Sequence, residues 1–260
     1  MLGAIIGDVV GSVYEFDNIR TKQFPLLSEK SKFTDDTVLT VAVMDWILHE
    51  NNKNQETAQI YLRKWGQKYP YSGFGCRFFD WLNSKTPKPY GSYGNGCAMR
   101  ISALGWSSDD IEDVKSLSDT VTGVTHNHPE GLKGAFVVAQ LISMARQCKS
   151  KIEMQMFARQ YYDLDFDYEE LRRTYKFNEK AQTTIPQAIY CFLASNNFID
   201  CLRTSVSIGG DTDTLCAISC AIAEAYYNYI PEELIDGVRN KLPDEMLIII
   251  DEFKKKYGGN

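Results

Sequence analysis

Residues 207–227 read SIGGDTDTLCAISCAIAEAYY. From Thr214 onward the residues are small or apolar for several turns, a pattern that predicts a buried helix. Two glycines and two aspartates stand directly before this helix. Both residue types are unfavourable inside a helix, and a buried carboxylate is costly unless it is paired or bound to a metal. Asp211 and Asp213 are therefore candidates for a functional role.

The spacing of the apolar residues is helical through almost the whole chain. Helical patterns occur at 3–14, 35–49, 55–69, 96–105, 131–147, 152–162, 186–195 and 213–228, and again after Pro231. Alternating strand patterns are scarce, and proline and glycine fall mainly between the helical segments. No low-complexity linker or fixed-period repeat divides the chain. The sequence therefore predicts one all-α domain over residues 1–260, with about ten or more helices.

Small residues indicate which of these helices are central. Two stripes recur every four residues: Gly3, Gly7 and Gly11 in the first helix, and Ala217, Ala221 and Ala225 in the late one. Such stripes let helix backbones approach closely, at a cost in helix propensity for each glycine. We expect both helices in the middle of the bundle, and the residues that precede the late helix to lie near the centre too.

Composition excludes several classes of function. The chain of 260 residues has a formal net charge of −6, which argues against a nucleic-acid-binding surface. The N-terminal MLGAIIGDVVGS lacks a basic flank and contains Asp8, so it predicts neither a signal peptide nor a membrane span. Seven cysteines without a CxxC pair indicate reduced, mostly buried thiols. We therefore expect a cytoplasmic protein that binds neither membrane nor nucleic acid.

A second acidic sequence precedes the helix predicted at 35–49. Residues 34–37 read TDDT, and they open that helix as residues 211–214, DTDT, open the late one. Each can be a helix cap, because hydroxyls and carboxylates accept hydrogen bonds from the free N–H groups there. If both starts lie at the centre, however, four carboxylates and two or three hydroxyls converge.

Four carboxylates carry four negative charges, which two divalent cations would balance. The ligands would all be oxygens, and this favours Mg²⁺, with Mn²⁺ as a substitute, over Zn²⁺. The two acidic starts thus predict a two-metal centre, with Asp211 and Asp213 among its ligands.

Two further segments could contact a ligand. Residues 90–100, YGSYGNGCAMR, run through three glycines into a helix, so they form either an anion-binding loop or an ordinary one. Tyr93 in this segment could stack on a base or be an ordinary tyrosine. Residues 125–131, THNHPEG, hold two of the three histidines. They could form a capped turn, a diphosphate contact or an acid–base group.

In their order along the chain, these segments strongly resemble the ADP-ribosylglycohydrolase family. The matching sequences are GDVVGSVYEF, FTDDTVLT, GSYGNGCAMR, THNHPEG, IPQAIYCFL and GGDTDT. The pair TDDT and GGDTDT is specific, and the resemblance runs from Gly3 to about Pro231. It implies an all-α orthogonal helical bundle with a binuclear Mg²⁺ site.

The resemblance also implies roles for individual residues. The implied metal ligands are Thr34, Asp35, Asp36, Asp211, Asp213 and Thr214. The implied contacts to the ADP-ribose part of a substrate are Ser92, Tyr93, Gly94, Asn95 and His126. Glu15 matches a glutamate on a mobile segment after the first helix. Glu15, Asp36 and Asp211 are the catalytic candidates, and which of them is the main base is left open.

The implied activity is hydrolysis of the N- or O-glycosidic bond between ADP-ribose and an acceptor, either a protein side chain or a small conjugate. Breaking this bond develops oxocarbenium character, so the site must orient the ribose and prepare a water molecule. Two alternatives stay open: an inactive ADP-ribose-binding or structural homologue, and a di-magnesium nucleotide phosphohydrolase. A monomer is expected.

Overall fold

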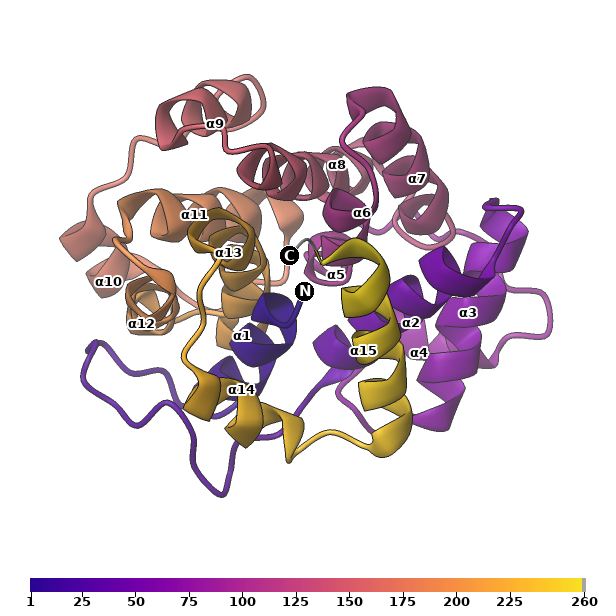
Figure 1. Ribbon diagram of the computed structural model, residues 1–260, viewed down its shortest axis with the longest axis horizontal. Helices are drawn as coiled ribbons and strands as arrows, with labels where there is room; N and C mark the ends of the chain where they lie inside the picture. The colour runs from indigo at the N-terminus through magenta and orange to yellow at the C-terminus, as the bar shows by residue number, and fades with distance from the viewer. Residues whose placement is uncertain (259–260) are drawn as a thin grey trace.

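The computed structural model describes residues 1–258, and its regular structure is helical (Figure 1). The fifteen helices of this part are α1 (Gly3–Gly11), α2 (Asp35–His49), α3 (Gln55–Lys68), α4 (Cys76–Asn83), α5 (Gly96–Met99), α6 (Ser102–Ser107), α7 (Ile111–Gly123), α8 (Pro129–Arg146), α9 (Lys151–Ala158), α10 (Tyr168–Thr174), α11 (Ala181–Ala194), α12 (Phe198–Ile208), α13 (Thr212–Tyr227), α14 (Glu232–Arg239) and α15 (Asp244–Tyr257). Among the described residues, the one strand-like pairing is an isolated bridge between Gly94 and Lys180. The predicted all-α fold is confirmed.

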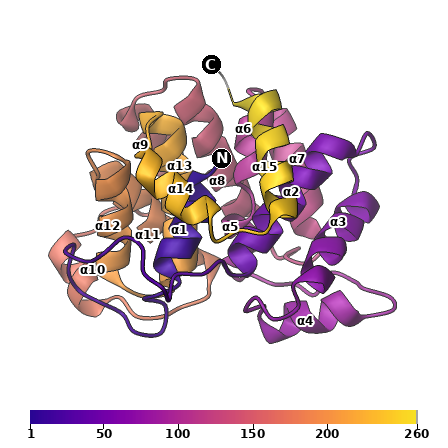
Figure 2. The same ribbon diagram turned by 60° about the horizontal axis from the view of Figure 1, so that its bottom comes forward.

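Helices α1 and α13 pack against each other along the length of α1, in the middle of the molecule (Figures 1 and 2). A Cβ atom on Gly3, Gly7 or Gly11 would lie less than 3.0 Å from backbone atoms of α13. Only glycine therefore allows the two helices to come this close, as the stripe predicted. The facing row on α13 contains Thr212, Cys216, Cys220 and Glu224, with Ala217 beside it, so the cysteines next to the alanine stripe form part of the contact.

The structure departs from the predicted elements in several places. Four helices lie outside the predicted segments: α4, α7, α10 and α12. Helix α12 is rich in serine and in the β-branched residues threonine, valine and isoleucine, which are weaker helix formers. It is stabilised by its cap, in which the Asn197 side chain accepts a hydrogen bond from Asp200 N at 2.8 Å, and by packing on α13. Here tertiary contacts override the local propensity.

Two segment boundaries also differ. The single helix predicted at 96–105 is broken at Arg100 and Ile101 into α5 and α6. Helix α11 begins at Ala181 and runs through Pro186, where the prediction begins its helix. The proline lacks an N–H group and so leaves one hydrogen bond of the first turns unmade.

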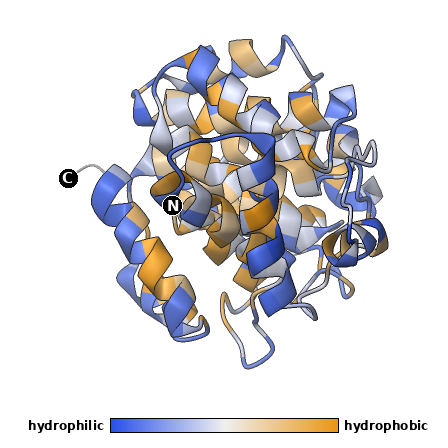
Figure 3. Cartoon of the chain, turned by 90° about the vertical axis from the view of Figure 1, so that its right-hand side faces the viewer, coloured by the Kyte–Doolittle hydropathy of each residue, from blue (hydrophilic) through white to orange (hydrophobic). Residues whose placement is uncertain are grey.

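The interior has the composition expected from the sequence. Figure 3 shows hydrophobic residues on the helices in the middle and hydrophilic residues on the outer loops. All seven cysteines are free and five of them are buried. Within residues 1–258, no helix combines the length and the apolar run that crossing a bilayer would require.

Candidate active site

A cavity of about 560 Å³ lies where helices α2, α5 and α13 begin. Its walls are the first turn of α2, residues 73–78, residues 90–100 and the first turn of α13, with Glu15 and Phe177 added from two loops. The fold thus brings most of the predicted site residues to one place, although they are distant in sequence. Two of them do not line this cavity, namely Thr34 and Tyr93.

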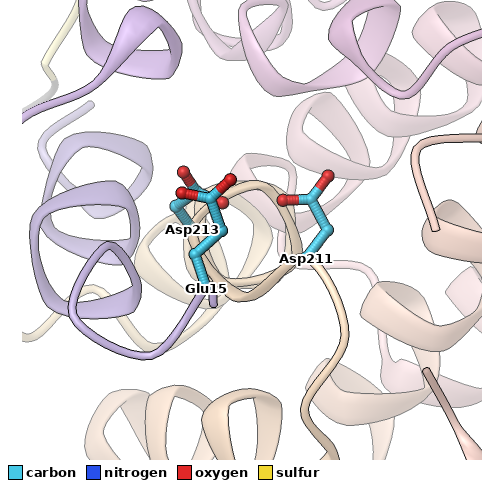
Figure 4. A group of neighbouring side chains, drawn as sticks. All are labelled: Glu15, Asp211 and Asp213. Carbon is cyan, nitrogen blue, oxygen red and sulfur yellow. The ribbon is translucent and has the colours of Figure 1, made fainter. Parts of the chain in front are cut away.

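The tightest group of acids in the cavity is Glu15, Asp211 and Asp213 (Figure 4). One carboxylate oxygen from each lies within 4.8 Å of the other two. Asp211 caps α13, Asp213 stands in its first turn, and Glu15 comes from the loop after α1. Gly209 and Gly210 have φ values of 70° and 86°, which glycine adopts readily, and they turn the chain into this position. Glu15 therefore lies directly among the predicted metal ligands.

The first turn of α2 brings two more carboxylates to the cavity. Asp36 is buried, its Oδ2 accepts a hydrogen bond from Thr214 Oγ1 at 3.3 Å, and its Oδ1 has no partner. Asp35 is partly exposed to the cavity, and its backbone N–H donates to Ser72 O. Thr34 lies behind them as the cap of α2, where its Oγ1 accepts from Asp36 N at 3.2 Å.

Asp8 is a site residue that the sequence analysis did not assign. It is fully buried in α1, and its carboxylate accepts four hydrogen bonds, from the N–H and the hydroxyl of both Thr34 and Thr37. These bonds attach the start of α2 to α1 and orient the Thr34 hydroxyl. Burial raises the pKa of Asp8 to about 6. The sequence signal that points to Asp8 is a charged residue within an apolar helix that carries a glycine stripe.

The acids of the cavity raise one another's pKa values. Burial, and then the charges of neighbouring carboxylates, hold the pKa values of Asp35, Asp36 and Asp213 well above their usual range. Burial raises the pKa of Asp211 to about 6. The pKa of Glu15 rises to about 8, first through burial and then through the charge of Asp213 and a hydrogen bond to it. The carboxylate cluster therefore lacks the positive charge that would neutralise it.

This arrangement fits divalent cations. The orphaned Oδ1 of Asp36 is buried and needs a positive partner. The available donors are carboxylate and hydroxyl oxygens, which are the ligands that Mg²⁺ prefers. Within residues 1–258, no lysine or arginine forms a salt bridge with Glu15, Asp35, Asp36, Asp211 or Asp213.

Positively charged side chains also line the cavity. Arg77 and Arg100 line it together with His126 and Tyr90. Burial and the two arginines lower the pKa of His126 well below its usual value, so this histidine is neutral at physiological pH. The cavity wall therefore combines a carboxylate cluster with two guanidinium groups.

Most backbone N–H groups in the loop of residues 90–96 already have hydrogen-bond partners within the protein. The amides of Gly91, Ser92, Gly94 and Asn95 all donate hydrogen bonds within the protein. The Asn95 side chain donates to Asp211 Oδ2 at 2.7 Å, so in this structure it positions an acid. The Tyr93 ring lies outside the cavity, with its centroid 5.3 Å from that of His128. Ser92 and Gly94 do line the cavity, as expected.

The segment that carries Glu15 is attached to the rest of the protein, where the sequence suggested a mobile stretch. Asn18 exchanges hydrogen bonds with the backbone of Gly210, and Arg20 donates to the carbonyl oxygens of Ile208 and Tyr175. These contacts hold the segment on the turn before α13. Glu15 is thus placed by the same turn that places Asp211.

One prediction follows from the raised pKa of Glu15. The folded protein holds a proton on Glu15 up to a pH of about 8, whereas the unfolded chain loses it near the ordinary value of 4.5. The proton retained on Glu15 stabilises the folded protein at low pH. This stabilisation is lost as the pH rises through the pKa that Glu15 has in the folded state. Without divalent cations, the melting temperature of the wild type should therefore fall relative to that of Glu15→Gln between pH 6 and pH 8.5.

Thermal unfolding in EDTA across this pH range is the measurement. Saturating Mg²⁺ should remove the pH-dependent difference if cations neutralise the cluster. A difference between the two proteins that stays constant with pH would show that Glu15 has an ordinary pKa.

Comparisons with known proteins identify the family of this chain. The family model for ADP-ribosylglycohydrolase matches residues 1–259. The chain therefore belongs to the ADP-ribosylglycohydrolase family, which defines it as a glycosidase whose relatives hydrolyse ADP-ribose linkages.

Individual relatives support this assignment. The chain is 26% identical to ADP-ribosylhydrolase ARH3 of Homo sapiens, over 89% of this chain and 86% of that protein. It is 23% identical to ADP-ribosyl-[dinitrogen reductase] glycohydrolase of Rhodospirillum rubrum, over 93% and 88% of the two chains. A solved structure, "ADP-ribosylglycohydrolase-related protein complex", shares the fold with a TM-score of 0.75 at 21% identity, covering 98% of this chain and 95% of its own.

Proposed function

We propose that this protein is a Mg²⁺-dependent hydrolase that cleaves the N- or O-glycosidic bond between ADP-ribose and an acceptor, and so reverses ADP-ribosylation. The observation that carries the proposal is a single cavity lined both by the carboxylate cluster and by Arg77, Arg100 and His126. ADP-ribose needs both kinds of group, because a diphosphate with two negative charges is joined to a neutral ribose. In this proposal the diphosphate lies beside the arginines and the scissile ribose beside the carboxylates.

The carboxylate cluster would hold two Mg²⁺ ions, or Mn²⁺ in their place. The proposed ligands are Thr34, Asp35, Asp36, Asp211, Asp213 and Thr214, and Glu15 lies close enough to Asp211 and Asp213 to join them. The hydroxyl of Thr34 donates a hydrogen bond to Asp8 and accepts one from Asp36 N, so one oxygen lone pair is left for a ligand role. When bound, the cations would neutralise the carboxylates and orient the 2- and 3-hydroxyls of the ribose.

The chain's own residues would manage the proton transfers. Attack of water on C1 of the ribose needs a base, and the leaving side chain needs a proton. Glu15, Asp36 and Asp211 are the carboxylates available for these steps. Glu15 stands out because it comes from a loop, is only partly buried, and lies beside Asp211 and Asp213. Asn95 keeps Asp211 oriented through its 2.7 Å hydrogen bond.

The test is a panel of defined ADP-ribosylated peptides and small conjugates, assayed with Mg²⁺ and with EDTA. Release of intact ADP-ribose that depends on Mg²⁺ supports the proposal. Release of AMP would indicate a nucleotide phosphohydrolase instead. Binding of ADP-ribose without any turnover on the panel would indicate an inactive homologue.

Glu15→Gln is expected to lower kcat steeply, by about two orders of magnitude, which is typical for loss of a general acid or base. Glutamine keeps the size and hydrogen-bonding reach of glutamate but cannot accept or deliver the proton. The affinity for ADP-ribose, measured by calorimetry in Mg²⁺, should change little. Turnover close to that of the wild type would remove Glu15 from the catalytic candidates.

A further inference from the structure

Arg100 is an arginine buried without a carboxylate partner. It follows α5, its side chain is completely buried, and its Nε and Nη1 atoms have no hydrogen-bond partner. Its Nη2 donates to Thr125 Oγ1 at 2.8 Å, and the ring of Phe78 lies 5.9 Å from the guanidinium carbon. Burying an unpaired charge costs free energy, so a stable fold alone would not favour an arginine here.

The hydrogen bonds of Arg100 have a fixed direction. A guanidinium group is always protonated and only donates, so Thr125 Oγ1 must accept from it. Thr125 Oγ1 lies 2.8 Å from His126 Nδ1, and Arg100 Nη2 itself lies 3.5 Å from the same nitrogen. The guanidinium group can only donate, and the threonine hydroxyl still has one hydrogen to donate, so both contacts favour Nδ1 as the acceptor and place the proton of the neutral ring on Nε2.

The Nε2 atom of His126 faces residues 94–96. It lies 3.7 Å from the position that a Cβ atom would take on Gly94, and 3.4 Å from that position on Gly96. Because both residues are glycines, they place no side chain of their own against this N–H group, and His126 lines the same cavity as Arg77. The neutral ring thus presents one hydrogen-bond donor on the part of the cavity wall formed with the arginines.

Burial and the two arginines near the ring favour this neutral state. Burial has the largest effect, and Arg100 after α5 and Arg77 from α4 lower the pKa of His126 further. Tyr90 is the nearest aromatic neighbour, at 6.1 Å between ring centroids, and Glu179 lines the same cavity. On the side of α8, the Nδ1 of His128 accepts a hydrogen bond from Glu130 N.

We propose that Arg100 is a positioning residue that acts through Thr125 to keep His126 neutral and to fix its Nε2–H as a donor to the diphosphate of the substrate. The part of this inference that concerns the substrate rests on the proposed function. The tautomer itself does not, because it follows from hydrogen bonds within the protein. The role of Arg100 is therefore to prepare a neutral donor, and it does so across the whole pH range in which an ordinary histidine would titrate.

The first test is NMR of the histidine rings in the full-length protein without ligand. The chain has only three histidines, His49, His126 and His128, so long-range ¹H–¹⁵N spectra can be assigned with single His→Gln variants. We expect His126 to show a protonated Nε2 and an unprotonated Nδ1 that do not change from pH 5.5 to pH 8.5. A protonated Nδ1, or titration near the ordinary pKa of 6.5, would overturn the proposal.

The second test breaks the chain of hydrogen bonds. Thr125→Val keeps the volume but removes the hydroxyl, and Thr125→Ser is the conservative rescue. In Thr125→Val we expect His126 to lose its single tautomer and the Kd for ADP-ribose to rise about tenfold, with both restored by Thr125→Ser. Arg100→Lys should keep the tautomer of His126 and the affinity for ADP-ribose closer to those of the wild type than Arg100→Leu does. If Arg100→Leu does not fold, the two threonine variants test the proposal.

The two proposals can fail separately. If wild-type protein does not bind ADP-ribose but His126 has the expected tautomer, the proposed function fails and the positioning role of Arg100 stands. If Thr125→Val leaves both the tautomer and the affinity of wild type, the positioning role fails whatever the substrate is.

Discussion

Replacing Asp213 by asparagine is expected to lower turnover by about two orders of magnitude or more. Asp213 contributes an oxygen to the tight group with Glu15 and Asp211, and its Oδ1 accepts from Thr214 N at 2.9 Å. Asparagine can keep that hydrogen bond while it removes one negative charge and one anionic ligand. The loss should therefore come from weaker cation binding rather than from misfolding.

The measurement is the release of ADP-ribose from a conjugate that the wild type cleaves, at increasing Mg²⁺ concentration. Asp119→Asn is the matched control, because Asp119 lies on the surface in an ion pair with Lys115. It should retain the activity of the wild type. EDTA should inactivate the wild type, with Mg²⁺ or Mn²⁺ restoring it. Full activity in EDTA, or in Asp213→Asn at low Mg²⁺, would contradict a cation site at these carboxylates.

Gly7→Ala is expected to lower the free energy of unfolding by at least about 3 kcal/mol, at the upper end of what overpacking costs. The added Cβ atom would lie within 3.0 Å of backbone atoms of Cys216 and Ala217, and backbone cannot move aside as a side chain can. Helices α1 and α13 would have to separate. For a domain of this size the melting temperature should fall by about 10 °C.

Gly123→Ala is the control for this change. Gly123 ends α7, and a Cβ atom there would approach closely only the far end of the Gln55 side chain, which can rotate away. Its melting temperature should stay within a few degrees of the wild type. Because α13 carries Asp211 and Asp213, Gly7→Ala should also weaken Mg²⁺ binding where it remains folded. Equal melting temperatures for the two variants would show that α1 and α13 can separate at little cost.

The sequence motifs indicate only part of the geometry of the candidate site. TDDT and GGDTDT each indicate an acidic helix start, and the structure places both at one cavity. The motifs do not indicate that the tightest three oxygens belong to Glu15, Asp211 and Asp213, or that Asn95 holds Asp211. They also do not indicate that the Tyr93 ring packs near His128, away from the residues that line the cavity. Neighbouring side chains in a loop can point in opposite directions, and only the backbone conformation decides which of them faces the ligand.

The sequence by itself determined the helical class, the close contact of α1 with another helix, and the residue types at the acidic starts of α2 and α13. These features are local, because they follow from the spacing of apolar residues, from glycines without side chains and from preferences at helix caps. Only the tertiary structure decided that Asp8 holds the start of α2, that α12 is a helix, and that Arg100 is buried against Thr125 and His126. Each of these depends on contacts between segments far apart in the chain, where packing and burial set the free energy and local sequence does not.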